Sequence, residues 1–526
     1  MPNSSRRAKR GNGAAKVKFW ITLRKLSQYI SLLLVISLII ATRNTNWQKG
    51  LANLPINLDP LLMVANFLST REFQISALLA IVTIVITFIV GRVWCGWVCP
   101  LGTTLDFFKF LHPSKKRASE IHIPQKWRSL KYLILTGVLL SALFGNLTLL
   151  ILDPLTIFYR STSAAIWPAL DWFFTSAEKG LYNIPLLNSP INFLEIWLRP
   201  AVFPSSPLYY QQALTIFLLL VGIIALEYLA PRFWCRYLCP LGAMLGLISK
   251  TALVRRQVGF ECKGCVLCDN SCPTGTIDPA RSYASDPSEC TMCLDCLSAC
   301  PRDSINFPMG KPELLSRDYD PARREFLATL GITAISIGVL RSQGSNQIKQ
   351  PHLLLPPGSK PDNFLTMCVR CSECIQACPT GGLQPSFLDS GIEGFWTPQL
   401  IPRIGYCEYS CNKCGQICAV QAIPLLDLTE KQETIIGKAY IDQNRCIAWA
   451  DHNDCIVCEE MCPLPEKAVY LEASKVTGFD GVEKEILLPY VNRDLCIGCG
   501  ICENKCPVTS EAAIRVYSSV DADLSV

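Results

Sequence analysis

Cysteine is the residue type in this sequence whose number and spacing could do chemistry. The 526 residues include 28 cysteines, which fall into eight groups with none left over. Four of these groups have the spacing C-x2-C-x2-C-x3-C followed by proline, and the first two of the four lie close together in the chain. The cysteines of these first two groups are Cys262, Cys265, Cys268 and Cys272, and Cys290, Cys293, Cys296 and Cys300. An iron–sulfur cubane needs a thiolate at each iron, and one tight loop of this kind supplies three of them. The two runs therefore predict [4Fe–4S] ligand sets.

Four further runs of four cysteines lie toward the C-terminus. The first and last are regular, with Cys368, Cys371, Cys374 and Cys378, and Cys496, Cys499, Cys502 and Cys506. The second has a wider first gap and Ala419 in place of proline, with Cys407, Cys411, Cys414 and Cys418. The third carries an eight-residue insertion, with Cys446, Cys455, Cys458 and Cys462. Structural zinc usually takes two separate C-x2-C pairs, and disulfide scaffolds rarely repeat one triplet spacing, so we expect about six [4Fe–4S] clusters.

The first two runs resemble the bacterial two-cluster ferredoxins, in which the fourth cysteine of each run binds the neighbouring cluster. This resemblance implies one cluster on Cys262, Cys265, Cys268 and Cys300, and another on Cys290, Cys293, Cys296 and Cys272. The irregular later runs resemble the four-cluster subunits of molybdoenzymes, which pair the first run with the fourth and the second with the third. Simple tandem ferredoxins pair adjacent runs instead. The sequence leaves the pairing of the four later runs open.

The remaining four cysteines form an internal repeat. The segment R-V-W-C-G-W-V-C-P-L-G begins at Arg92, and R-F-W-C-R-Y-L-C-P-L-G begins at Arg232. If each C-x3-C stays helical, its cysteines lie on one face, while the following proline favours a break there. Two facing pairs would make a four-thiolate relay site that holds a metal or cluster, or that cycles between dithiol and disulfide. Its members are Cys95, Cys99, Cys235 and Cys239. Buried free cysteines are the alternative interpretation.

Composition indicates the elements that position these groups. Half of the residues are hydrophobic and the mean hydropathy is +0.27, which is too apolar for a soluble polyferredoxin. Stretches near the ~20 apolar residues that cross a bilayer predict four transmembrane helices. Their ranges are 26–41, 73–91, 132–152 and 213–230. We expect a membrane α-helical bundle combined with small α+β ferredoxin-like modules.

Basic residues predict the topology. Eight lysines and arginines lie in the first 25 residues, and the loop after the second span is also basic, whereas the loops after the first and third spans are poor in basic residues. The positive-inside rule then places the N-terminus and the first ferredoxin module in the cytoplasm, and the loop 153–212 outside. A nucleic-acid-binding arm is the rival interpretation of the basic N-terminus, and we expect no nucleic-acid partner.

A second targeting signal lies inside the chain. The segment A-R-R-E-F-L starts at Ala322, and an apolar stretch follows to Leu340. It resembles a twin-arginine signal, which exports folded proteins and so suits a domain with preassembled clusters. No A-x-A cleavage site is evident, so a fifth span is expected, with an exported domain beyond it. The expected parts are a basic N-terminus at 1–25, a membrane domain at 26–250, a two-cluster module at 251–315, the signal at 320–345 and a four-cluster domain at 360–515.

Missing motifs restrict the other cofactors. None of the four histidines lies in a predicted span and no C-x-x-C-H occurs, so we expect no haem. Neither G-x-G-x-x-G nor G-x-x-x-x-G-K is present, so we expect no nucleotide site. Glu227 is an acid within a span, with either a functional role or an ion pair to Arg232. The rings of Trp94, Trp97, Trp234 and Tyr237 are expected to anchor at the membrane interface.

The first part of the chain, roughly residues 18–310, resembles the NapH family of membrane quinol dehydrogenase components. The part from Arg323 onward resembles the NapG and MauM ferredoxin-type proteins, so the chain looks like a fusion of the two. This resemblance implies a bacterial cytoplasmic-membrane protein that takes electrons from quinol and passes them to a periplasmic redox protein or oxidoreductase. A factor that supplies electrons for maturation or reactivation of a periplasmic metalloenzyme is the alternative.

Overall fold

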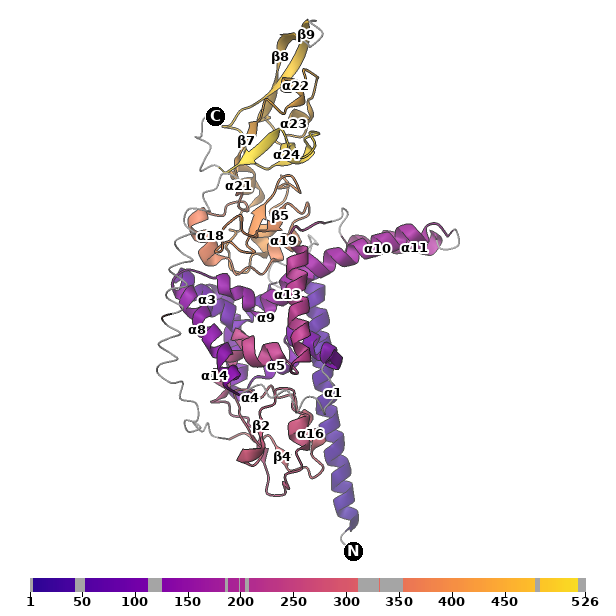
Figure 1. Cartoon of the computed structure of the whole chain (residues 1–526), viewed down its shortest axis with the longest axis vertical. Coiled ribbons are helices and arrows are strands. Elements are labelled where there is room, and N and C mark those ends of the chain that lie inside the picture. The colour runs from indigo at the N-terminus through magenta and orange to yellow at the C-terminus, as the bar shows by residue number, and fades with distance from the viewer. Residues whose placement is uncertain are drawn as a thin grey trace. The chain divides into compact units, whose positions relative to one another are not determined.

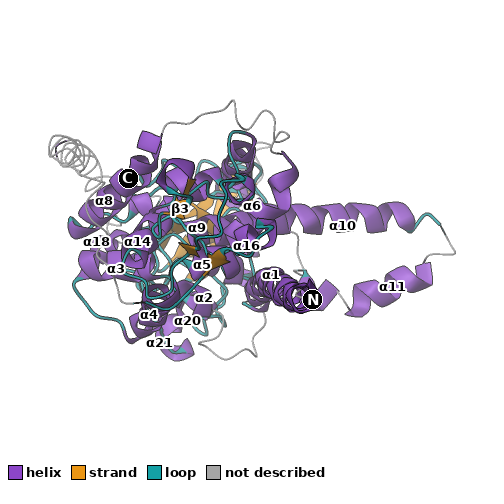
Figure 2. Ribbon diagram, turned by 90° about the horizontal axis from the view of Figure 1, so that it is seen from below, coloured by secondary structure: helices purple, strands orange, loops and turns teal. Residues whose placement is uncertain are grey.

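The computed structural model describes residues 3–42, 53–111, 125–184, 188–197, 199–203, 208–310, 331, 353–477 and 483–518. The chain divides into two compact units. The first unit comprises Met1–Leu38, Leu54–Phe158 and Leu218–Ser336, and the second comprises Ile39–Asn53, Tyr159–Phe217 and Ile337–Val526. Figure 1 labels the elements, and Figure 2 shows that helices outnumber the short strands. Each unit is described separately below.

The first unit is built on a helical bundle. Its long elements are α1 (Asn3–Ala41), α3 (Pro60–Thr70), α4 (Leu78–Val90), α8 (Leu130–Leu143), α13 (Ala213–Ala225) and α14 (Pro240–Ser249). Shorter turns between them are α2 (Leu54–Asn57), η1 (Ile75–Ala77), η2 (Phe108–Leu111), η3 (Gln125–Ser129), η4 (Thr148–Leu152), α9 (Pro154–Ser161) and η7 (Leu226–Tyr228). Helix α14 packs against α8 and α4, and α3 packs against α8. The fully buried Leu61, Leu62 and Leu245 show that this bundle has an apolar core.

Helix lengths bear on the predicted spans. Val17–Ala41 is long and apolar enough to cross a membrane, whereas the described apolar helices at Pro60–Thr70, Ile75–Val90, Ala213–Tyr228 and Pro240–Ser249 are shorter. The prediction of one continuous helix over 132–152 is wrong, because α8 ends at Leu143. Gly145 there adopts a left-handed φ of 79°, and the N–H of Asn146 bonds back to Ser141 O at 2.9 Å. Glycine at such a position commonly ends a helix.

A second internal repeat, L-D-P-L at 58–61 and 152–155, starts two helices of the first unit. Asp59 caps α3 through the N–H groups of Leu61 and Leu62, and Asp153 caps α9 through Leu155 and Thr156. Both aspartates are completely buried. Asp59 Oδ2 and Asp153 Oδ1 accept from no donor in the described part of the chain, and the two side chains interact with each other. One shared proton would satisfy both oxygens.

Burial raises the pKa of Asp59 to about 6, and burial beside Asp59 raises the pKa of Asp153 well above its ordinary value. The folded protein therefore binds protons more tightly than unfolded aspartate, whose pKa is about 3.9. Since this pair holds more protons in the folded state, its contribution to stability is greatest below about pH 4 and falls as the pH rises through about 6 and above.

We predict that Asp153→Asn flattens this pH dependence, because asparagine keeps the helix cap and removes the second acid. The unfolding midpoint of the variant should fall less between pH 5 and pH 8 than that of the unaltered protein, as measured by thermal unfolding in detergent. The control is Asp278→Asn, a cap on η9 (Pro279–Arg281) that is 35% exposed. An equal pH dependence in Asp153→Asn and the unaltered protein would contradict the shared proton.

The first unit also contains a small α+β module. Strand β1 (Gln257–Val258) pairs antiparallel with β4 (Ile305–Asn306), and β2 (Ile277–Asp278) pairs with β3 (Ala284–Ser285). Helices α15 (Leu267–Asn270) and α16 (Asp295–Ala299) pack against each other. The core joins Ile277 and Ile305 to Cys268 and Cys296. The two ends of the module are therefore joined by one strand pair, and its middle is joined by the other.

The second unit combines helical segments with a larger cysteine-rich α+β domain. The former are η5 (Thr162–Ile166), α10 (Trp167–Leu181), α11 (Asn188–Trp197) and α12 (Arg199–Val202). The latter contains α18 (Pro361–Met367), α19 (Glu373–Ala377), α20 (Lys413–Ile417), α21 (Leu428–Glu433), α22 (Ile447–Ala450), α23 (Val457–Glu460) and α24 (Ile501–Lys505). Its antiparallel pairs are β5 (Leu383–Pro385) with β6 (Pro398–Leu400), β7 (Lys438–Ile441) with β10 (Ile514–Tyr517), and β8 (Val469–Thr477) with β9 (Glu483–Val491).

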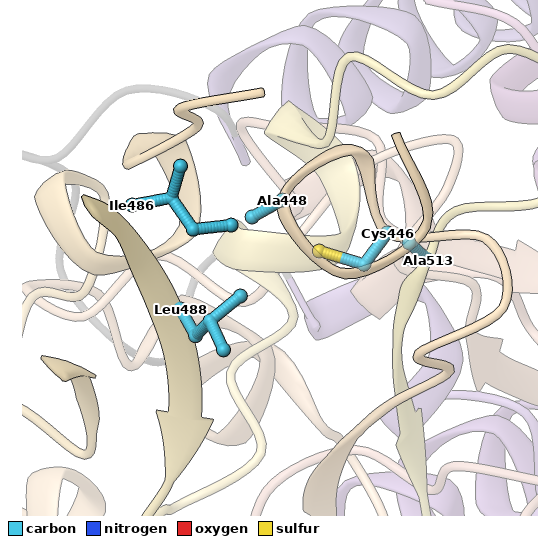
Figure 3. Packing of buried hydrophobic residues seen from close by; sticks show 5 residues of the cluster. All are labelled: Cys446, Ala448, Ile486, Leu488 and Ala513. Carbon is cyan, nitrogen blue, oxygen red and sulfur yellow. The ribbon is translucent and has the colours of Figure 1, made fainter. Parts of the chain in front are cut away.

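The eight-residue insertion of the third C-terminal run has a structural role. It contains α22, which packs against β9. Figure 3 shows Ala448 of this helix and Cys446 beside Ile486 and Leu488 of the long hairpin. Trp449 also donates its Nε1–H to Pro489 O at 3.2 Å. The insertion thus covers Cys446 with an apolar lid without changing the four-cysteine set. The predicted signal at 320–345 lies outside the described residues except for Gly331.

Candidate iron–sulfur and thiol sites

The two C-x3-C-P segments of the first unit adopt matching conformations. Cys95 lies in α5 (Val93–Trp97), and Cys235 lies in the π-helical turn η8 (Trp234–Leu238). Cys99 and Cys239 follow in non-helical conformations and cap α6 (Pro100–Phe107) and α14. The predicted break at proline is confirmed, and because of it the two cysteines of each segment do not lie in one continuous helix. The break arises because proline is favourable at the first position of the helix that follows.

The structure brings all four of these cysteines together. Each is at most 8% exposed. Burial raises the pKa of the Cys99 thiol, and Cys95 and Cys235 raise it further. Burial likewise raises the pKa of Cys239, with the other three cysteines adding to the shift. The Sγ atoms of Cys99 and Cys239 each accept a backbone N–H, from Gly102 at 3.5 Å and Gly242 at 3.2 Å. We name this group the four-thiol site.

Two buried arginines flank the four-thiol site. Arg232 donates from Nη1 to Cys95 O at 3.1 Å, and its Nη2 lies 2.6 Å from Asp106 Oδ2. Attraction to this guanidinium holds the pKa of Asp106 at about 2, although burial opposes the shift. Glu227 accepts the backbone N–H of Arg232 at 2.9 Å, while the guanidinium of Arg232 binds Asp106. Arg92 occupies the equivalent position in the first repeat.

The α+β module of the first unit packs directly on the four-thiol segment. Arg92 donates to Ser288 O at 2.7 Å, and Trp97 donates to Met292 O at 3.0 Å. A Cβ atom on Gly96 would lie 2.1 Å from Thr291 O. Because these contacts are made by the loop that carries Cys290, the four-thiol site and the second cysteine run of the module are neighbours.

Three of the four aromatic residues predicted to anchor at the interface are buried in the protein, which differs from what the sequence suggested. Trp94, Trp234 and Tyr237 are 8%, 5% and 2% exposed. The prediction that they anchor at a membrane interface is wrong for these three, because protein surrounds their rings. They lie in the protein interior, in the same segments as the four cysteines.

The cysteines of the module meet as the ferredoxin resemblance implied. One cavity of about 130 Å³ is lined by Cys262, Cys265, Cys268 and Cys300. Around the second set, burial raises the pKa of Cys290 to about 12, and Cys272 and Cys296 add to the shift. Burial also raises the pKa of Cys293, and Cys272 and Cys290 add to that shift. The fourth cysteine of each run therefore joins the other set.

Adjacent runs also pair in the second unit. Cys446, Cys455, Cys458 and Cys506 line one cavity, and Cys462, Cys496, Cys499 and Cys502 line another. Burial raises the pKa of Cys374, followed by contributions from Cys371, Cys368 and Cys418. Burial raises that of Cys414 too, followed by Cys407, Cys378 and Cys411. The alternative that sequence reasoning left open is thereby settled in favour of the pairing of simple tandem ferredoxins.

The two pairs of sets in the second unit are themselves joined. The N–H of Cys407 donates to Cys499 O at 2.8 Å, and each of these cysteines belongs to a different pair. Lys431 donates to the carbonyl of Tyr409 at 3.1 Å in the same region. The four sets therefore form a continuous row in which those of Cys368 and Cys446 lie at the two ends.

The ligand sets of the modules have the donors of iron–sulfur clusters. Over the described ranges, no three His, Cys, Asp or Glu side chains are arranged to hold one metal ion. A cubane separates its ligand sulfurs more widely than a single ion does, and each set offers four cysteines, which is the donor set of a [4Fe–4S] cluster. The residues present therefore fit iron–sulfur clusters, which transfer single electrons when bound.

Small two-stranded modules with sets of four cysteines define an iron–sulfur protein of the ferredoxin type. Two family models described as "4Fe-4S binding domain" match the chain, one over residues 73–118 and 212–261 and the other over 489–508. The cysteines within the first match are only those of the four-thiol site. No solved structure matches the chain.

The chain belongs to the family of the ferredoxin-type proteins MauM and NapG. It is 30% identical to the methylamine utilization ferredoxin-type protein MauM of Methylorubrum extorquens, over 38% of this chain and 91% of the relative. It is 34% identical to the ferredoxin-type protein NapG of Haemophilus influenzae, over 40% of this chain and 74% of the relative. For NapG of Escherichia coli the identity is 32%, over 38% and 89%. The protein is thus an iron–sulfur electron-transfer protein.

The roles of several residues in the first unit did not follow from the cysteine motifs. Arg92 and Arg232 stand three residues before the first cysteine of each repeat, and Asp59 and Asp153 stand in a repeated L-D-P-L. Glu289 had no such signal, because its role depends on Arg92 and Lys131, which lie far from it in sequence. Repeated polar residues outside the cysteine motif were the available clue.

We predict that Gly96→Ala loosens the module from the four-thiol segment. Its Cβ would collide with Thr291 O, and overpacking of this kind costs about 1–3 kcal/mol. The unfolding midpoint of the purified protein should fall accordingly. Gly222→Ala is the matched control, because a Cβ there meets nothing within 4 Å. Equal midpoints for the two variants would argue against tight docking.

We also predict how iron losses combine in the second unit. If Cys506 and Cys446 bind the same cluster, the double variant Cys506→Ala with Cys446→Ala should contain as much iron as Cys506→Ala alone. The double variant Cys506→Ala with Cys368→Ala should lose the sum of the two single losses, because these cysteines belong to separate sets. Iron analysis of the purified variants measures both. Additive losses in the first double variant and shared losses in the second would indicate the nested pairing of molybdoenzyme subunits.

Proposed function

We propose that this chain is a membrane-bound electron-transfer protein that carries electrons from quinol to a periplasmic acceptor through six [4Fe–4S] clusters. The membership in the MauM and NapG family supports the electron-transfer part of this proposal. The resemblance of residues 18–310 to NapH supports quinol as the donor. Oxidation of a quinol releases two protons with its two electrons, so the electrons pass on one at a time to centres that accept single electrons.

One observation carries the proposal: the four-thiol site and the second cysteine set of the module are neighbours inside one unit. The loop from Ser288 to Cys293 contacts Arg92, Gly96 and Trp97 of the first repeat. A redox centre held by the four thiols would therefore have a second acceptor beside it, which is the arrangement that stepwise electron transfer requires.

The contacts inside each unit support a two-sided arrangement. In the first unit the module binds segments that the charge pattern assigns to the cytoplasm, through Arg24 with Asp295 at 3.2 Å and Arg128 with Thr274 O at 3.3 Å. Each part of this unit thus has partners expected on its own side of a membrane.

In the second unit, the C-terminal cysteine domain contacts segments that are expected on the periplasmic side of the membrane. The hydroxyl of Tyr210 donates to Ile375 O at 3.3 Å, and Gln384 donates to Tyr209 O at 2.9 Å. The guanidinium of Arg160 lies 4.0 Å from the ring centre of Trp396. The loop predicted to be periplasmic therefore packs on the C-terminal cysteine domain, which supports export of that domain. Its continuous row of four sets suits delivery of electrons over a distance.

We predict that a reduced quinol, added anaerobically to the full-length protein in detergent, bleaches the visible absorption and produces cluster EPR signals. Cys95→Ser should abolish this reduction by quinol and leave reduction by dithionite intact, because only the route through the four-thiol site is broken. Reduction of the unaltered protein by dithionite but not by quinol would reject quinol as the donor. Undiminished reduction of Cys95→Ser by quinol would reject the relay.

A further inference from the structure

We propose that Arg92 and Arg232 are positioning residues that balance the negative charge of an iron–sulfur cluster held by the four-thiol site and raise its reduction potential. The role that we give to this centre rests on the proposed electron-transfer function. The proposal adds a seventh cluster to the six sets of the ferredoxin modules, and it names the residues that tune it.

The first argument is the number of buried cations. Arg92, Arg232 and Lys131 are each at most 1% exposed. The carboxylates facing them are Glu289, which binds both Arg92 and Lys131, and Asp106, which binds Arg232. Nearby, Arg24 pairs with Asp295 at 3.2 Å, and Glu227 accepts the backbone N–H of Arg232. Buried charges are costly unless they are compensated. Arg92 and Lys131 share the single carboxylate of Glu289, and a further negative charge at the four thiols would balance this local excess.

The second argument is where the guanidinium groups lie. Arg232 of the second repeat donates to the carbonyl of Cys95 in the first repeat. Arg92 of the first repeat reaches the second repeat, since its Nη2 lies 2.7 Å from the position that a Cβ on Gly242 would occupy. Arg92 interacts electrostatically with Cys95 and Cys239, and Arg232 with Cys235. Each arginine thus reaches the repeat to which it does not belong, and each interacts with cysteines of the four-thiol site.

The positions of the two arginines bear on which group occupies the four-thiol site, because the candidates differ in charge. A disulfide and a pair of protonated thiols are neutral, so neither balances a buried guanidinium. A single metal ion with four thiolate ligands would be anionic, and the iron content and EPR signal measured below distinguish it from a cluster. A [4Fe–4S] cluster with four thiolate ligands is anionic and becomes more negative on reduction. Nearby positive charge therefore stabilises its reduced form most, because charge is felt strongly where water is excluded.

Arg92→Gln is the sharpest test, because Glu289 keeps Lys131 as a partner when Arg92 is removed. The centre is first identified by comparing two proteins. The double variant Cys95→Ala with Cys235→Ala should contain four fewer irons than the unaltered full-length protein and should lack one of its EPR signals. The potential of the centre is then measured by EPR-monitored titration with dithionite and redox dyes. Arg92→Gln should shift the reduction equilibrium toward the oxidised form at least tenfold, which is about 59 mV for one electron.

Two further variants complete the test. Arg92→Lys keeps the charge and should restore most of the potential, and it also provides a protein to measure if glutamine prevents folding. Arg281→Gln removes an arginine that is 62% exposed and should change nothing. Unchanged iron content in the double cysteine variant would overturn the cluster, and an unchanged potential in Arg92→Gln with full iron would overturn the role of the arginine. The titration uses dithionite and not quinol as the reductant. Its outcome therefore does not depend on whether quinol is the physiological donor.

Discussion

The requirement that a cubane cluster takes four thiolates from the chain is the constraint on which the cysteine domains depend. A tight loop provides three, so the fourth comes from a different run. Cys300 joins the set of Cys262, and Cys506 joins the set of Cys446. Each exchange ties two loops together, and short antiparallel strand pairs hold them in register. The modules need little other core, which explains why cysteines themselves belong to their hydrophobic clusters.

Buried charge organises the first unit in a similar way. Arg232 joins its own repeat to Asp106 and to the carbonyl of Cys95, and Arg92 joins the four-thiol segment to Ser288 and Glu289 of the module. Each guanidinium offers several donors in a fixed plane, so one side chain can bind partners on several segments. The electrostatic balance of the thiols and the docking of the module therefore depend on the same arginines.

The buried aspartate pair shows another use of the duplicated sequence. Each L-D-P-L segment starts a helix by itself, because aspartate caps and proline occupies the first helical position. Their meeting in one unit adds a property that neither segment has alone, since two adjacent buried carboxyl groups resist losing both protons. The same applies to the two C-x3-C-P segments. Duplication thus supplied matched halves, and folding made sites from them.

Local spacing by itself determined which cysteines are cluster ligands in the regular runs, where the C-x3-C-P segments break, and that Cys95, Cys99, Cys235 and Cys239 form a matched repeat. These features depend on a few neighbouring residues, so the sequence carries them directly. Tertiary structure alone decided the pairing of the four later runs, the end of α8 at Leu143 and the partner of Arg232. Arg232 and Asp106 are 126 residues apart in sequence, and Arg92 and Glu289 are 197 apart. Such contacts are selected by packing and by the cost of an unpaired buried charge, and neither leaves a periodic signal in the sequence.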